Sequence, residues 1–75
     1  MIRPIDDRFE QEMRQLLAEG RYREASQEMS LRAEDRLTLA EALEIERMIY
    51  DVTASGEWKS LEKILARQLE LERAR

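Results

Sequence analysis

Apolar residues recur every three or four positions along most of the chain, a spacing that places them on one face of an α-helix. A first helix is predicted to begin near Pro4 and to end at Gly20, which can adopt the left-handed conformation that closes a helix. A second helix with a narrower apolar face follows at once. The two apolar faces are predicted to be Ile5, Phe9, Met13, Leu16 and Leu17 for the first helix and Tyr22, Ala25, Met29 and Ala33 for the second.

The periodicity lapses between Arg32 and Leu37, and Thr38 and Glu41 then stand in the arrangement of a capping box. A third helix is therefore predicted over residues 39–52. The alternative is that the second helix continues unbroken through the charged segment, which would give three helices in place of four. The apolar residues of this central helix cover more than half of its circumference: Leu39, Ala42, Leu43, Ile45, Met48, Ile49 and Val52.

Ser55 and Gly56 interrupt the pattern again, and a fourth helix is predicted to open at Glu57. The last residues, 70–75, are strongly charged, so we expect them to fray or to extend into solvent. The inner face of this fourth helix is predicted to carry Trp58, Leu61, Ile64, Leu65 and Leu69.

Composition supports the helical interpretation. Strong helix formers dominate, only two glycines and one proline occur, and apolar and polar residues nowhere alternate over the length of a strand. A chain of 75 residues makes a single domain, 1–75. The predicted fold is an all-α small bundle of four helices, or alternatively three, arranged as two glycine-hinged antiparallel hairpins.

The segment EGRYREASQEM (residues 19–29) is echoed by SGEWKSLEKIL (residues 55–65). In each copy an aromatic residue, Tyr22 or Trp58, follows the glycine two positions later, and we expect it to fold over its own turn and fasten the hairpin. This spacing resembles the inter-helix turn of tetratricopeptide repeats. The resemblance implies a scaffold or chaperone-like role, in which paired helices present a groove to a partner peptide. An ordinary helical hairpin closed by glycine and an aromatic residue has the same spacing.

A second resemblance lies in IYDVTASGEWK (residues 49–59), which is similar to the C-terminal segment of the Hha and YmoA family of nucleoid-associated modulators. In that family too, a Tyr-Asp pair precedes a Trp-Lys pair at this separation. The resemblance implies a small all-helical protein that modulates transcription by binding a DNA-organising partner.

Charge and missing residue types narrow the functional classes. The formal net charge of −4 argues against general nucleic-acid binding, because such proteins normally carry a basic face. Cysteine and histidine are absent, which excludes a disulfide scaffold, the usual zinc sites and the commonest catalytic bases and thiol nucleophiles. We therefore expect no enzyme activity and no metal or cofactor site. No apolar run approaches the roughly 18 residues of a membrane span, so we expect a cytoplasmic protein without a membrane partner.

Eleven of the thirteen basic residues are arginines. Many have an acidic neighbour three or four positions away, as Arg14 has in Glu10, and such pairs support helices. Arg21 and Arg36 are expected to lack such a partner. A helix-turn-helix DNA reader, with Arg21 and Arg23 at the start of the second helix, is the alternative interpretation of this region.

These patterns predict a small non-catalytic module, bacterial or phage-like in style, that acts as an adaptor, chaperone or regulator by binding another protein. The alternative is a transcriptional or nucleoid modulator that acts through a DNA-binding partner or reads DNA itself. The apolar helix over residues 39–52 and the adaptable methionines favour a homodimer. Aromatic, methionine and arginine side chains are enriched at interfaces, so the predicted partner-binding residues are Tyr22, Met29, Met48, Trp58, Arg21 and Arg36.

Overall fold

The computed structural model describes residues 7–74, and this part of the chain is helical almost throughout and contains no strand. The all-α prediction is therefore confirmed. The predicted helix start near Pro4 and the apolar position Ile5 lie outside the described residues. The elements are α1 (Asp7–Ala18), α2 (Tyr22–Arg36), α3 (Leu39–Ser55), the short 3-10 turn η1 (Trp58–Ser60) and α4 (Leu61–Arg73).

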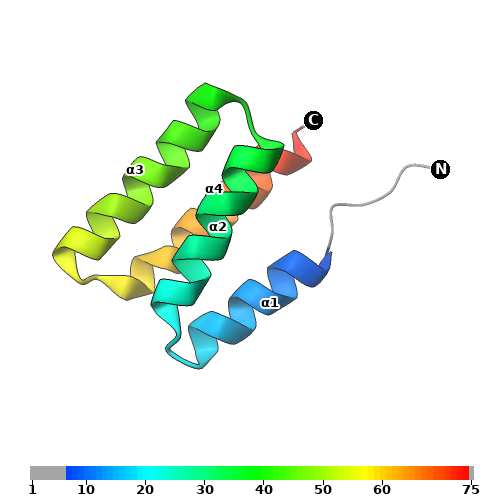
Figure 1. Ribbon diagram of the computed structural model, residues 1–75. Coiled ribbons are helices and arrows are strands. Elements are labelled where there is room, and N and C mark those ends of the chain that lie inside the picture. Colours follow the sequence, from blue (N-terminus) through cyan, green and yellow to red (C-terminus); the bar gives the residue numbers. More distant parts are fainter. Residues whose placement is uncertain (1–6, 75) are drawn as a thin grey trace.

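The helices form two hairpins, α1 with α2 and α3 with α4, which pack together as one bundle (Figure 1). Helices α2 and α4 each pack against the other three, while α1 and α3 lie on opposite sides of the bundle. Both hairpin turns lie at one end of the bundle. The connection between α2 and α3 lies at the other end, near the end of α4 and the start of α1 (Figure 1).

Both hairpin turns depend on a glycine in the left-handed region of backbone space. Gly20 has φ of 76° and Gly56 has φ of 77°, a conformation that strains residues with a β-carbon. A β-carbon built on either glycine would meet no atom within 4 Å. Backbone conformation, and not crowding, is therefore the reason for glycine at these two positions, as the sequence predicted.

The boundary between α2 and α3 is set by the capping box. The Thr38 hydroxyl accepts a hydrogen bond from the Glu41 backbone N–H at 3.2 Å, and the Glu41 carboxylate accepts one from the Thr38 N–H at 3.1 Å. These bonds satisfy backbone donors that the first helical turn leaves free. The chain thus has separate second and third helices, and the alternative of one unbroken helix is wrong.

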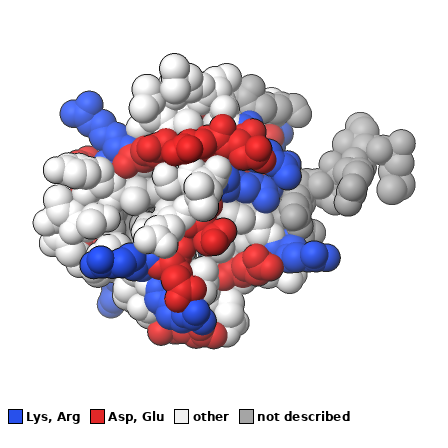
Figure 2. Space-filling model, in the orientation of Figure 1, with Lys and Arg blue, Asp and Glu red and all other residues white. Residues whose placement is uncertain are grey.

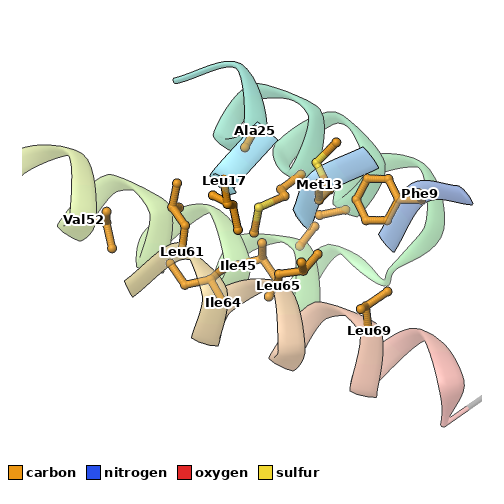
Figure 3. Packing of buried hydrophobic residues seen from close by; sticks show 13 residues of the cluster. Phe9, Met13, Leu17, Ala25, Ile45, Val52, Leu61, Ile64, Leu65 and Leu69 are labelled. Carbon is orange, nitrogen blue, oxygen red and sulfur yellow. The ribbon is translucent and has the colours of Figure 1, made fainter. Parts of the chain in front are cut away.

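The core is built from one apolar face of each helix (Figure 3). Two of the three apolar residues that α2 buries are alanines, and such small side chains let neighbouring helices approach closely. The surface around this core is dense in charges of both signs (Figure 2). The buried apolar residues are Phe9, Met13, Leu17, Ala25, Met29, Ala33, Ala42, Ile45, Val52, Leu61, Ile64, Leu65 and Leu69.

Two predictions about the fourth helix are wrong. The α-helix does not open at Glu57: the 3-10 turn η1 comes first, and α4 begins at Leu61. Residues 70–73 are also not frayed, because α4 continues to Arg73. Its last turn is anchored by Glu72, which is buried, and by Arg73, which forms an ion pair with Glu10 of α1.

Candidate interaction sites

The two aromatic residues of the echoed segments contact each other. The rings of Tyr22 and Trp58 are stacked, with centroids 5.9 Å apart and planes 11° from parallel. Each ring was predicted to cover its own turn, and nothing in the sequence indicated this contact between the rings, which joins the two hairpins. Both side chains are half-buried, and together with Gly56, Lys59 and Ser60 they line a shallow, open hollow.

Of the two methionines predicted to contact a partner, Met29 lies in the core and Met48 lies at its edge. Met29 is fully buried, so the expectation that it reaches a partner is wrong in this fold. Its backbone carbonyl accepts a hydrogen bond from the Gln68 side-chain amide of α4 at 3.1 Å. Met48 is half-buried and packs against the core from α3.

Arg21 and Arg36 were expected to lack an acidic partner at helical spacing; this prediction is wrong for Arg21, whereas Arg36 pairs with its immediate neighbour. Arg21 donates to Glu24 at 2.7 Å and to Glu19 at 3.1 Å, and these hydrogen bonds raise the pKa of its guanidinium. Arg36 pairs with Asp35 at 3.0 Å at the opposite end of the bundle. The Arg21–Glu24 pair has ordinary helical spacing, so the sequence already contained the signal for it.

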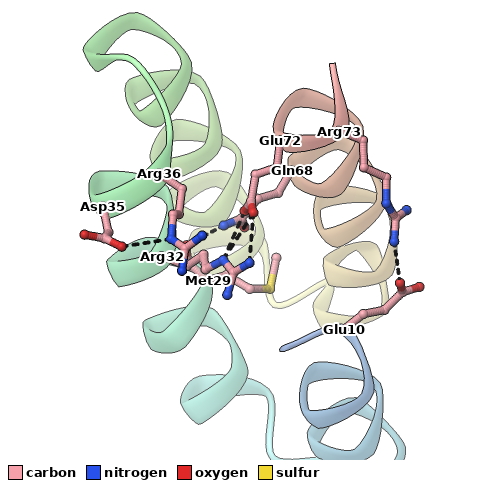
Figure 4. Close-up of polar contacts among 8 residues, drawn as sticks. All are labelled: Glu10, Met29, Arg32, Asp35, Arg36, Gln68, Glu72 and Arg73. Carbon is pink, nitrogen blue, oxygen red and sulfur yellow. Dashed lines mark hydrogen bonds and ion pairs between the residues drawn. The ribbon is translucent and has the colours of Figure 1, made fainter. Parts of the chain in front are cut away.

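A partly buried polar cluster joins α2 to α4 at the end opposite the glycine turns (Figure 4). The Arg32 guanidinium donates to the Glu72 carboxylate at 3.0 Å, and their side chains are only 11% and 5% exposed. The same guanidinium lies 4.4 Å from the centre of the Phe9 ring, a cation–π contact with α1. Arg32 also has an acidic neighbour at helical spacing, Glu28, but its partner in the fold lies forty positions along the chain.

Two further polar contacts complete this end. Arg73 of α4 donates to Glu10 of α1 at 2.8 Å (Figure 4), and Glu10 also accepts from Arg14 at 2.9 Å. The hydrogen bond from Arg73, and then that from Arg14, lower the pKa of Glu10. Gln68 is fully buried, and its Oε1 has no partner among the described residues.

Helix α3 carries a line of large apolar side chains that face solvent. Leu39 is 78% exposed, Leu43 56% and Tyr50 72%. Their spacing places them within about 40° of one another around the helix axis. Leu39 and Leu43 belong to the apolar set that was predicted to cover more than half of this helix's circumference, whereas Tyr50 was not singled out. We call these three residues the α3 stripe.

Glu46 occupies the helical position between Leu43 and Tyr50 in this stripe. Its pKa is raised, first by partial burial and then by the nearby Glu34 carboxylate of α2.

Searches with this chain return no significant relatives. No protein-family model matches it, and no curated protein and no solved structure is significantly similar. Residues 7–74 hold no helix long and apolar enough to cross a membrane, and no group of three or more acidic side chains arranged around a common metal position.

Proposed function

We propose that this protein is a small, non-catalytic protein-interaction module of the cytoplasm, and that it forms a homodimer through the α3 stripe. The observation that carries the proposal is the outward position of Leu39, Leu43 and Tyr50. Large apolar groups gathered on one side of a small protein are characteristic of surfaces that another protein covers.

A second copy of the chain suits this surface. Together with Glu46, the three stripe residues are spaced four, three and four positions apart, the seam of a two-helix coiled coil. In a two-fold dimer the same patch covers itself, so one exposed stripe is enough for both partners. The stripe is about 16 Å long, which is short for a stable dimer, and a reversible, concentration-dependent association is therefore expected.

The charge pattern gives less support to the alternative, a DNA-binding protein, than to a module that binds another protein. Arg21, which was to approach a DNA groove, is engaged by Glu19 and Glu24. Carboxylates beside a basic residue repel the phosphate backbone on which non-specific DNA affinity depends.

The test is the oligomeric state of matched variants, measured by sedimentation equilibrium over a wide concentration range. Wild type is expected to shift from monomer to dimer as its concentration rises. Leu43→Glu in the stripe is expected to remain a monomer, because it replaces a central apolar contact with a second carboxylate next to Glu46. The control is Leu31→Glu on α2, whose leucine is similarly exposed at 62% and should leave association unchanged.

Two outcomes contradict the proposal. One is a wild-type protein that stays strictly monomeric up to about 1 mM, where even weak specific dimers are populated. The other is equal loss of association in both leucine variants, which would place the interface elsewhere. Circular dichroism of each variant confirms that the helices are intact.

A further inference from the structure

A groove runs between α1 and α2 on the side of their shared turn and has a volume of about 450 Å³. Met13 and Leu16 are its apolar lining residues; Met13 is buried, so Leu16, which is partly exposed, provides the apolar surface that a ligand can reach. This size lies within the range of sites that hold a few side chains of a ligand. The groove belongs to the α1–α2 hairpin, whereas the α3 stripe lies on a helix at the opposite side of the bundle.

Four carboxylates line this groove: Glu12 from α1, Glu19 from the turn, and Glu24 and Glu28 from α2. Arg21 is the one basic residue among the lining side chains, and it is shared between Glu19 and Glu24. Figure 2 shows acidic and basic side chains together over the region where α1 and α2 meet.

The two carboxylates farther from the turn, unlike Glu19 and Glu24, do not contact Arg21. Glu12 and Glu28 stand on opposite helices that flank the groove, and neither forms an ion pair within residues 7–74. Two unpaired negative charges on either side of an apolar floor attract a ligand with positive charges around an apolar side chain.

We propose that the α1–α2 groove is a docking site for a basic amphipathic segment of a partner protein. An apolar side chain of that segment seats against Leu16, and flanking lysine or arginine side chains reach Glu12 and Glu28. The proposal rests on the protein-binding role proposed above and not on dimerisation. It specifies the chemistry of the partner: a helix or extended segment in which apolar and cationic residues share one face.

The apolar floor is an essential part of this site. An exposed ion pair contributes little in water, so carboxylates alone would bind any polycation weakly and without selectivity. Contact with Leu16 adds affinity only for a segment that carries an apolar residue between its charges. Both parts together distinguish an amphipathic basic segment from a purely basic one.

The experiment uses fluorescence anisotropy of a short labelled peptide made of lysine and leucine in amphipathic order. A second peptide has the same charge but serine in place of leucine. Wild type is expected to bind the first peptide at micromolar concentrations and the second at least about fivefold more weakly. Binding of both is expected to weaken with added salt, since surface ion pairs are screened.

Matched variants test whether the peptide binds in the α1–α2 groove. The double variant Glu12→Gln/Glu28→Gln is expected to bind the leucine-containing peptide about fivefold or more weakly. The control Glu57→Gln/Glu62→Gln removes the same charge from exposed positions outside the groove and should stay within about twofold of wild type.

Three results overturn the inference: no binding of the leucine-containing peptide up to about 1 mM, equal affinity for both peptides, or equal weakening in the two double variants. The outcome is separable from that of the dimer test. Leu43→Glu should be monomeric and still bind the peptide, and Glu12→Gln/Glu28→Gln should still dimerise.

Discussion

At the end of the bundle that carries the glycine turns, the two hairpins meet through the stacked rings of Tyr22 and Trp58. At the opposite end they meet through charged and polar groups, chiefly Arg32 with Glu72 and Glu10 with Arg73 (Figure 4). A core formed by four short helices is thus closed by an aromatic contact at one end and by ion pairs at the other.

The difference matters because the two kinds of contact tolerate change differently. Stacked aromatic rings gain free energy mainly from buried area, and they can slide without losing it. A desolvated ion pair adds little net stability over an apolar pair of the same size, but removal of one partner leaves a charge in a poorly solvated place. The polar end is therefore expected to be the more sensitive end.

The largest effect is expected for Glu72→Ala, which leaves the Arg32 guanidinium largely buried without its carboxylate. We expect a loss of about 2–4 kcal/mol in the free energy of unfolding, measured by urea denaturation. Glu72→Gln keeps a hydrogen-bond acceptor and should lose less. Glu70→Ala is the control, because its ion pair with Arg67 is exposed and contributes less than about 1 kcal/mol. Equal losses for Glu72→Ala and Glu70→Ala would show that the polar end does not depend on the buried pair.

A smaller effect is expected at the aromatic end. Trp58→Ala should lose about 1–3 kcal/mol, since the ring is only half-buried, and Trp58→Phe should lose less because it keeps a stack. A double-mutant cycle with Tyr22→Ala, read by thermal unfolding, should give a coupling of about 0.5–1.5 kcal/mol. A coupling of zero would mean that the two rings lie together without stabilising the joint between the hairpins.

The sequence predicted the features that depend on neighbours along the chain. The left-handed glycines, the Thr38–Glu41 capping box and the inner faces of α1 and α2 all follow from local backbone rules. The sequence did not predict contacts between residues that are far apart along the chain. Arg32 has an acidic residue at helical spacing, and nothing local indicates that Glu72, at the far end of the chain, is its partner.

The candidate sites were harder to predict for a related reason. The apolar residues of α3 surround most of its circumference, so periodicity alone does not say which of them face the core. The bundle covers Ala42, Ile45 and Val52 and leaves the α3 stripe outside. Likewise, Tyr22 and Trp58 occur at equivalent places in the two echoed segments, and only the packing of the hairpins brings them together.

Alanine at either glycine of the turns should have a moderate and similar effect. Neither position is crowded, so the cost is that of placing an L-residue in the left-handed region, about 1–2 kcal/mol. Asparagine tolerates this conformation better and should lose less at both sites. Urea denaturation of Gly20→Ala and Gly56→Ala measures the effect. A much larger loss at one turn would show that its geometry, beyond its backbone conformation, positions the aromatic stack.

The smallest effect concerns the dependence of stability on pH. Hydrogen bonds from Arg73 and Arg14 lower the pKa of Glu10 below its ordinary value of 4.5. The folded state therefore favours the ionised carboxylate, and this contribution is present above that pH and is lost as the pH falls through the lower folded pKa. Glu10→Gln should be slightly less stable than wild type at pH near 7, and the difference should disappear in acid.

Glu46 is expected to show the opposite dependence of stability on pH. Burial and the Glu34 carboxylate raise its pKa, so the folded state favours the protonated form and gains stability as the pH falls. Glu46→Gln should accordingly be slightly more stable than wild type near pH 7, with the advantage shrinking in acid. Urea denaturation of both variants at neutral and acidic pH measures the two trends. If Glu10→Gln is as stable as wild type at neutral pH, the ion pair between Glu10 and Arg73 does not help to hold the polar end of the bundle, and if Glu46→Gln is less stable than wild type there, the raised pKa of Glu46 carries no cost to folding.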